Sequence, residues 1–142
     1  MHAVLALPAI AVLVAVSVSD VRRRVIPNVV IVPAWAIALT VNMAFHPGQA
    51  AEWLAWSLGS GLCFLIFALA TRGGFGMGDV KLVAFLGAVL GPALLSALAL
   101  GTLLGGLAAG LILLRHGRAG SRRTVAYGPY LAAGGLVVLL LG

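Results

Sequence analysis

The chain alternates long apolar stretches with short polar loops, and these stretches are the first guide to its fold. Five of them hold few or no charges: Ala3–Ser19, Asn28–Phe45, Ala50–Thr71, Leu82–Leu114 and Tyr127–Gly142. A membrane-spanning helix needs about 20 residues, so the fourth stretch is too long for one crossing. Gly91-Pro92 interrupts it, and this pair is typical of a turn. The pattern therefore predicts about six transmembrane helices, over residues 3–19, 28–45, 50–71, 79–90, 92–114 and 126–142.

Composition places these stretches in a membrane. Hydrophobic residues make up 63% of the 142 residues and charged residues only 8%. A soluble domain of this size needs a more polar surface, whereas a surface in lipid does not. We therefore expect an all-α integral membrane protein, with one domain over residues 1–142 in contact with the lipid bilayer. No Lys or Arg precedes the first apolar run, so we expect a retained span rather than a cleaved signal peptide.

The basic residues predict the topology. A net charge of +6 in a soluble protein would suggest a nucleic-acid partner, but here the positive-inside bias explains it, and we expect no nucleic acid. With six spans, every Lys and Arg falls on one face, which we expect to be cytoplasmic, with both termini outside. A five-span arrangement would move the last four arginines outside, so we reject it. The basic residues are Arg22–Arg24, Arg72, Lys81, Arg115, Arg118, Arg122 and Arg123.

Acidic residues are scarce, and two of the three mark a candidate site. Asp20 and Asp79 lie where apolar segments meet basic loops on the predicted cytoplasmic face, while Glu52 lies near the predicted outer surface. The fourth span is short, so Asp79 should be recessed below the membrane surface. A carboxylate in lipid costs several kcal/mol, which favours a water-filled cavity around Asp79.

Each aspartate also has a simpler interpretation. Asp79 suits the N-cap of a helix, where a carboxylate satisfies free amides and the positive dipole end. That does not account for the four glycines in residues 73–78, which permit close approach of a second backbone or form a flexible loop. Asp20 lies at a helix C-terminus, where the dipole disfavours its charge and Arg22–Arg24 would offset it as interface ion pairs.

Taken together, the two aspartates fit one chemical plan. Two carboxylates that share a proton leave one charged and one neutral. The charged one takes a proton from water, which attacks a peptide carbonyl, while the neutral one polarises that carbonyl and helps protonate the leaving amine. Neither role is assigned to one residue, because such a pair titrates as a unit. The sequence contains no evident Ser–His or Cys–His pair, metal-ligand cluster or Cys-x-x-Cys motif, so we expect no metal and no cofactor.

Two motifs resemble those of a known family. Gly76-Met77-Gly78-Asp79, followed by Val80-Lys81-Leu82, is similar to the Gly-x-Gly-Asp motif of intramembrane aspartyl proteases, in the form found in type IV prepilin peptidases. Asp20, the basic stretch after it, and Ile26-Pro27-Asn28 resemble the first aspartate region of that family. Tyr127-Gly128-Pro129-Tyr130-Leu131 is similar to the beginning of the family's last helix.

The resemblance implies a membrane-embedded aspartyl endopeptidase. Its catalytic residues would be Asp20 and Asp79, and its substrate the leader of a type IV-like prepilin, cleaved at the cytoplasmic face of the inner membrane ahead of the apolar pilin helix. The compact chain resembles the peptidases of tight-adherence (Flp-type) pili. It lacks the domain with paired Cys-x-x-Cys motifs that is associated with N-methylation, so we expect peptidase activity only. The active-site loop or substrate-binding residues would be Gly76, Met77, Gly78, Lys81, Pro27 and Asn28.

Other polar residues are weaker candidates. Lys81 lies two positions from Asp79, so on a helix the two side chains diverge and Lys81 would reach lipid phosphate or substrate. Pro27 and Asn28 are expected to start the second span. Arg22–Arg24 are expected to determine topology rather than contact substrate. Segment ends hold the three histidines, His2, His46 and His116, for which we expect no catalytic role.

Small and aromatic residues predict packing. Cys63 is expected to be a packing residue, and the tryptophans, Trp35, Trp53 and Trp56, to be interface anchors or packing residues. The fifth span carries overlapping Gly-x-x-x-Gly pairs, which favour packing within the chain over a dimer interface. We make no prediction of oligomeric state. These glycines are Gly101, Gly105, Gly106 and Gly110.

Two other functions compete with a peptidase. A proton-coupled transporter also uses buried carboxylates, but it predicts them at mid-membrane, and no inverted repeat is visible. A non-catalytic subunit of a pilus or secretion assembly would tolerate neutral substitution of both aspartates.

Overall fold

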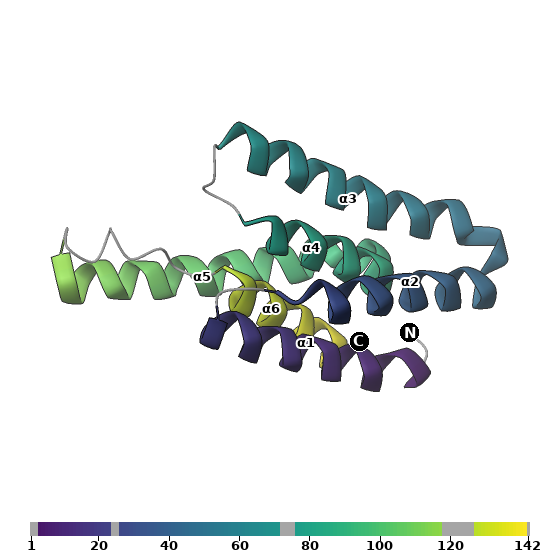
Figure 1. The fold of residues 1–142 in the computed structure, drawn as a ribbon, viewed down its shortest axis with the longest axis horizontal. Coiled ribbons are helices and arrows are strands. Elements are labelled where there is room, and N and C mark those ends of the chain that lie inside the picture. Colours follow the sequence, from purple (N-terminus) through teal and green to yellow (C-terminus); the bar gives the residue numbers. More distant parts are fainter. Residues whose placement is uncertain (1–2, 24–25, 72–75, 118–126, 142) are drawn as a thin grey trace.

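The computed structural model describes residues 3–23, 26–71, 76–117 and 127–141. These residues form α-helices and two short 3₁₀ turns, so the predicted all-α class is confirmed for them (Figure 1). The elements are α1 (Ala3–Arg23), α2 (Asn28–Phe45), η1 (Pro47–Gln49), α3 (Ala50–Ala70), α4 (Met77–Leu90), η2 (Gly91–Ala93), α5 (Leu94–His116) and α6 (Gly128–Leu141).

Successive helices run in opposite directions. In Figure 1, one end of the bundle holds the C-terminal end of α1 and the N-terminal ends of α2, α4 and α6. The opposite end holds η1 and η2, the N-terminal end of α1 and the C-terminal end of α6. Helix α5 is the longest and extends past the first end. This alternation brings the C-terminal end of α1 and the N-terminal end of α4 to the same end of the bundle, although α2 and α3 separate them along the chain.

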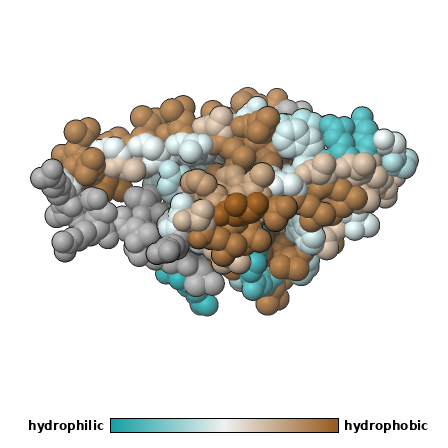
Figure 2. Space-filling view, turned by 90° about the horizontal axis from the view of Figure 1, so that it is seen from above, coloured by the Kyte–Doolittle hydropathy of each residue, from teal (hydrophilic) through white to brown (hydrophobic). Residues whose placement is uncertain are grey.

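Four continuous helical stretches are long and apolar enough to cross a membrane: Leu5–Arg23, Asn28–Phe45, Pro47–Ala70 and Met77–His116. Helix α6 is apolar but shorter. Large apolar side chains lie exposed on the bundle, and the face seen in Figure 2 is largely hydrophobic. Water would not stabilise such a surface, whereas lipid does. The chain is therefore a multi-pass membrane protein. Exposed examples are Leu62, Ile66, Leu103, Leu107 and Leu111.

The stretch from Met77 to His116 bends at Gly91, as the Gly91-Pro92 pair predicts. Gly91 has φ 54°, which favours glycine, and its N–H bonds the Gly87 carbonyl to close the end of α4. Pro92 then lies in the first turn of η2, where its missing N–H costs nothing. The bend divides the stretch into α4 and α5.

Two helix boundaries differ from the predicted ranges near the aspartates. Helix α1 continues to Arg23 rather than ending at residue 19, because basic side chains in a last turn complement the helix dipole. Helix α4 begins at Met77 rather than at Asp79, since Gly76 is the last residue with extended dihedrals. Both aspartates therefore lie inside helices.

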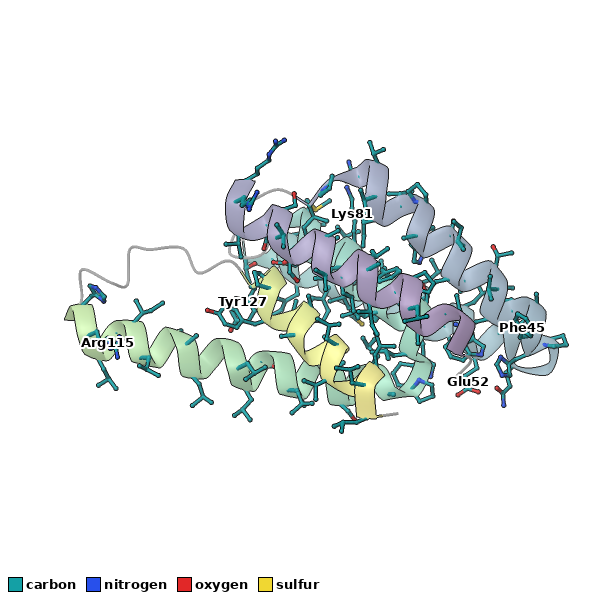
Figure 3. All side chains as sticks on the ribbon, turned by 90° about the horizontal axis from the view of Figure 1, so that it is seen from below. Phe45, Glu52, Lys81, Arg115 and Tyr127 are labelled. Atoms are coloured by element: carbon teal, nitrogen blue, oxygen red, sulfur yellow. The ribbon has the colours of Figure 1, made fainter. Side chains whose placement is uncertain are left out.

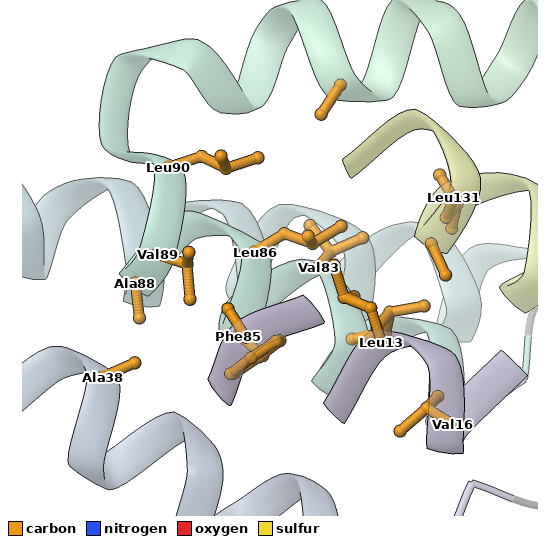
Figure 4. Packing of buried hydrophobic residues seen from close by; sticks show 14 of the residues in the cluster. Leu13, Val16, Ala38, Val83, Phe85, Leu86, Ala88, Val89, Leu90 and Leu131 are labelled. Carbon is orange, nitrogen blue, oxygen red and sulfur yellow. The ribbon is translucent and has the colours of Figure 1, made fainter. Parts of the chain in front are cut away.

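Helix α4 is the centre of the bundle. It packs against α2, α3 and α6, and most of its residues are buried. A helix that is apolar on every side is stable only when surrounded, whether by protein or by lipid. Its side chains meet those of α1, α2 and α6 in the core (Figure 4). Core residues labelled there include Leu13, Ala38, Val83, Phe85, Leu86 and Leu131.

Polar side chains join α4 to its neighbours within the apolar core. The Ser57 hydroxyl donates to the Ala84 carbonyl over 3.0 Å and accepts a hydrogen bond from Trp35 Nε1 over 2.7 Å. Asn42 Nδ2 donates to the Ala88 carbonyl over 2.7 Å. Polar groups in an apolar interior need such partners, so these bonds hold α2 and α3 in register with α4.

The glycines of α5 divide into two pairs. A Cβ on Gly101 would lie 3.0 Å from the Tyr130 carbonyl oxygen, and one on Gly105 would lie 3.4 Å from Tyr127, so these two pack on α6 as predicted. No atom of the described residues lies within 4 Å of a Cβ on Gly106 or Gly110. Packing within the chain therefore explains Gly101 and Gly105. The prediction of packing within the chain is wrong for Gly106 and Gly110.

Candidate active site

Asp20 lies in the last turn of α1 and faces the inside of the bundle. Its side chain is only 8% exposed, whereas its neighbours Arg22 and Arg23 are exposed. Leu13 and Val16, which precede it at helical spacing, are fully buried and define the same inward face. The helix periodicity that buries these apolar residues therefore carries the Asp20 carboxylate inward as well.

Asp79 is the third residue of α4 and is 9% exposed. Gly76 is the N-cap, so the N-cap interpretation of Asp79 is wrong by three positions. The Asp79 N–H donates to the Gly76 carbonyl over 3.1 Å. A carboxylate in the first turn of a helix also complements the helix dipole. These interactions hold its position.

The two carboxylates meet at Gly128, the first residue of α6. A Cβ atom built on Gly128 would collide with Asp20 Oδ2 and would lie 3.3 Å from Asp79 Oδ1. Both aspartates therefore face one point, which one water molecule or one peptide carbonyl could touch from both sides. Three elements converge here: the end of α1, the start of α4 and the start of α6.

This arrangement suits acid–base chemistry on a single reacting group. Two carboxylates directed at one point repel when both are charged, so a shared proton relieves the repulsion. The pair then offers a proton acceptor and a proton donor within reach of the same atom. Among the described residues, no three His, Cys, Asp or Glu side chains gather as a metal site.

The segment Ile26-Pro27-Asn28 packs directly on the first turns of α4. A Cβ on Gly78 would lie 3.0 Å from Ile26 Cδ1 and 3.2 Å from Ile26 Cβ, so glycine at this position allows the close approach. Lys81 Nζ donates a 2.6 Å hydrogen bond to Asn28 Oδ1. Residues of the two sequence motifs therefore contact each other, beside the aspartates.

The remaining loop candidates lie around this contact. Pro27 is the N-cap of α2, and its carbonyl accepts the N–H groups of Val30 and Ile31 over 3.1 Å each, so the second helix starts where predicted. Gly76 and Met77 are exposed at the start of α4. Lys81 Nζ bonds Asn28 in the structure. The expected contact of Lys81 with lipid phosphate or substrate stays a prediction.

Several other residues lie away from the aspartates. Glu52 is in the first turn of α3, and Figure 3 shows it near Phe45, at the end opposite Lys81 and Tyr127. The prediction that Cys63 packs inside is wrong, because Cys63 is exposed on α3. Of the two roles predicted for the tryptophans, interface anchors or packing residues, the structure supports packing, since all three are partly buried against the core. Positions that lie outside the described residues are His2, Arg24, Arg72, Arg118, Arg122 and Arg123.

Gly128 is the residue of this site that sequence reasoning missed as a site residue. The signal was present in Tyr127-Gly128-Pro129, a glycine and proline at the start of an apolar helix. A glycine before a helix has many explanations, however. Only the fold shows that two aspartates from other helices lie against this one.

Two buried aspartates directed at one point in an apolar helical bundle are the arrangement that the resemblance to membrane aspartyl proteases implies. The sequence model of the type IV leader peptidase family matches residues 7–114. The chain belongs to this family. The matched region contains both aspartates and ends before α6.

Curated relatives agree with this assignment. The chain is similar to the prepilin leader peptidase/N-methyltransferase of Bacillus subtilis, with 32% identity over 139 residues, 94% of this chain and 54% of that protein. It is 34% identical over 140 residues to the protein of the same description from Stutzerimonas stutzeri, covering 92% of this chain and 47% of that protein. The chain thus spans about half the length of these relatives. No solved structure matches it.

Proposed function

We propose that this chain is a membrane-embedded aspartyl endopeptidase that removes the N-terminal leader of type IV-like prepilins, of the Flp type. The observation that carries the proposal is the approach of Asp20 and Asp79 to one point at Gly128, in a chain of the leader peptidase family. A helix cap does not account for two buried carboxylates directed at one point. A two-aspartate hydrolytic site does.

The proposed mechanism uses the pair as a unit. The ionised aspartate accepts a proton from a water molecule, and the water oxygen forms a bond to the scissile carbonyl carbon. The protonated aspartate donates a hydrogen bond to the carbonyl oxygen, which stabilises the tetrahedral intermediate. The C–N bond then breaks, and the proton taken from water passes to the leaving amine. Either aspartate can start as the acid, so we assign the roles to the pair.

We further propose six membrane spans, with the aspartates near the cytoplasmic face of the cytoplasmic membrane and both termini outside. The described basic residues support this orientation, because Arg22, Arg23 and Lys81 lie at the end of the bundle that holds the aspartates. Glu52 lies at the opposite end. Basic residues concentrate on the cytoplasmic side of membrane proteins.

The proposed substrate is a leader peptide followed by the apolar N-terminal helix of a pilin. A site at one end of an apolar bundle suits this substrate, because the pilin helix remains in lipid while the polar leader lies at the surface. We propose the peptidase step without N-methylation, since the 142 residues contain one cysteine and no Cys-x-x-Cys pair. Mass spectrometry of the cleaved pilin tests this point: an unmodified N-terminal amine is expected.

The test of the peptidase proposal is leader removal from a tagged Flp-type prepilin co-expressed with the chain. We expect the wild type to cleave the leader, and the variants Asp20→Asn and Asp79→Asn each to lose cleavage while accumulating normally in the membrane. Glu52→Gln is the matched control, because it removes a carboxylate at the opposite end and should cleave at the wild-type rate. Normal processing by either aspartate variant would contradict the proposal.

The same experiment separates the competing functions. A transporter would show proton-linked uptake in proteoliposomes and no cleavage. An assembly subunit would support pilus formation with both aspartates neutralised. Both aspartates lie in the end turns of their helices rather than at mid-helix, which favours the peptidase over the transporter.

A further inference from the structure

Gly128 is the residue against which both aspartates rest. It is buried at the start of α6, and a Cβ there would collide with Asp20 Oδ2 and lie 3.1 Å from Asp20 Cγ and 3.3 Å from Asp79 Oδ1. Even alanine, the smallest substitution, would occupy space that the carboxylates now use. We propose that Gly128 is a positioning residue of the peptidase, whose missing side chain allows Asp20 and Asp79 to approach a common point. This inference rests on the proposed function.

Backbone conformation does not explain the glycine at this position. The described glycines with positive φ are Gly91 and Gly117, and Gly128 is not among them. The first turn of α6 is closed by hydrogen bonds of 3.1 Å from the N–H groups of Tyr130 and Leu131 to the Tyr127 carbonyl. An alanine at position 128 would suit this helical turn better than glycine does. The need for glycine is therefore one of space beside the aspartates.

Close packing against α5 and α4 fixes the position of α6 relative to the aspartates. A Cβ on Gly134 would collide with the Ala97 carbonyl and lie 2.7 Å from the Gly101 nitrogen, which shows how closely α6 rests on α5. On another side, a Cβ on Gly135 would lie 2.5 Å from Leu86 Cδ2 of α4. Close-packed helices resist displacement. A methyl group at position 128 would therefore move the carboxylates rather than the helix.

The expected consequence is loss of catalysis with the fold retained. Misplacing a catalytic group by about 1 Å costs about 100-fold in rate, so we expect Gly128→Ala to lower the rate of leader cleavage by about that factor. Gly106→Ala is the matched control, because no atom of the described residues lies within 4 Å of its Cβ position. This control should cleave at the wild-type rate.

The first experiment compares these variants in full-length chains co-expressed with the tagged Flp-type prepilin. Asp20→Asn and Asp79→Asn are included to test the underlying function separately. If either aspartate variant cleaves normally, the peptidase proposal fails, whatever Gly128→Ala does. If both are inactive and Gly128→Ala cleaves at the wild-type rate, the role of Gly128 is overturned and the peptidase proposal stands.

The second experiment is a double-mutant cycle measured as thermal unfolding in detergent, which needs no substrate. We expect Gly128→Ala to lower Tm in the wild type but not in an Asp20→Ala background, because the shortened side chain leaves room for the methyl group. Gly134→Ala is the structural comparison, and its loss of Tm should be the same in both backgrounds. Should Gly128→Ala fail to fold, recovery of folding in the double variant supports the inference. An equal loss in both backgrounds overturns it.

Discussion

The Lys81 ammonium group donates a 2.6 Å hydrogen bond to the Asn28 side-chain carbonyl and so ties the start of α2 to the second turn of α4. Asn28 follows Asp20 by only a short connection, and Lys81 follows Asp79 by two residues. The bond therefore joins the two chain segments that carry the aspartates.

Removing this bond should weaken catalysis more than stability. The pair is exposed, so we expect Asn28→Ala to lower the free energy of unfolding by only about 0.5–1 kcal/mol. Leader cleavage should fall by about tenfold or less, because α2 and α4 become less well placed relative to each other. Lys81→Met keeps the apolar stem and should give a similar loss. The double variant should be no worse than either single one, and additive losses would argue against a direct role of this bond.

The contact between Gly78 and Ile26 predicts a suppressor. A methyl group on Gly78 would lie 3.0 Å from Ile26 Cδ1 and 3.1 Å from Ile26 Cγ1, closer than ordinary contact. We expect Gly78→Ala to lower the free energy of unfolding by about 1–3 kcal/mol, through overpacking. Ile26→Ala in the same chain should recover part of that loss by making room. Thermal unfolding in detergent measures both, and an equal loss with and without Ile26 would contradict the contact.

Ser57 bridges α2, α3 and α4 through hydrogen bonds of its hydroxyl. Removing the hydroxyl should therefore lower the free energy of unfolding by more than the small loss of volume would. Ser57→Ala removes the donor to the Ala84 carbonyl and leaves the Trp35 indole N–H without its acceptor. We expect a loss of about 1–2 kcal/mol in the free energy of unfolding. Thr40→Ala is the control, since the Thr40 hydroxyl donates to the Ala36 carbonyl of its own helix at an exposed position. Equal losses for the two variants would show that the bridge contributes nothing.

The α3–α4 interface predicts a contrast between two glycines. A Cβ on Gly87 would lie 2.6 Å from the Trp56 carbonyl oxygen and 2.9 Å from Ser57 Cα, whereas no atom of the described residues lies within 4 Å of a Cβ on Gly59. Gly87→Ala must therefore separate the two backbones and should cost about 3 kcal/mol or more. Gly59→Ala should leave Tm unchanged or raise it, because alanine has the higher helix propensity. A tolerated Gly87→Ala would contradict the close approach.

Much of the fold was predictable because membrane insertion follows local rules. The lengths of the apolar runs, the break at Gly91-Pro92 and the all-helical class each depend on neighbouring residues alone. Whether an individual apolar or small residue faces the core or the lipid was not predictable from the sequence. Cys63 and Gly106 look like packing residues but are exposed, because lipid is as apolar as the core. Periodicity separates inside from outside poorly in such a chain.

The candidate site was likewise predictable from the sequence in part. Scarcity of acids and two motifs pointed to Asp20 and Asp79 from the sequence, and the structure brings their side chains to one point. The position of Asp79 within α4, three residues past Gly76, depended on where helical dihedrals begin, which sequence predicts only to within a few residues. That Lys81 bonds Asn28 depended on the packing of α2 against α4.

The sequence by itself determined the membrane class, the helical segments, the aspartate pair and the family resemblance, since each is a property of composition or of residues close together in the chain. Tertiary structure alone decided that the end of α1, the start of α4 and the start of α6 meet at Gly128. Such a meeting arises from contacts between helices far apart in sequence, where a missing side chain has as much effect as a present one. No local pattern records the space that a glycine leaves for two carboxylates from other helices.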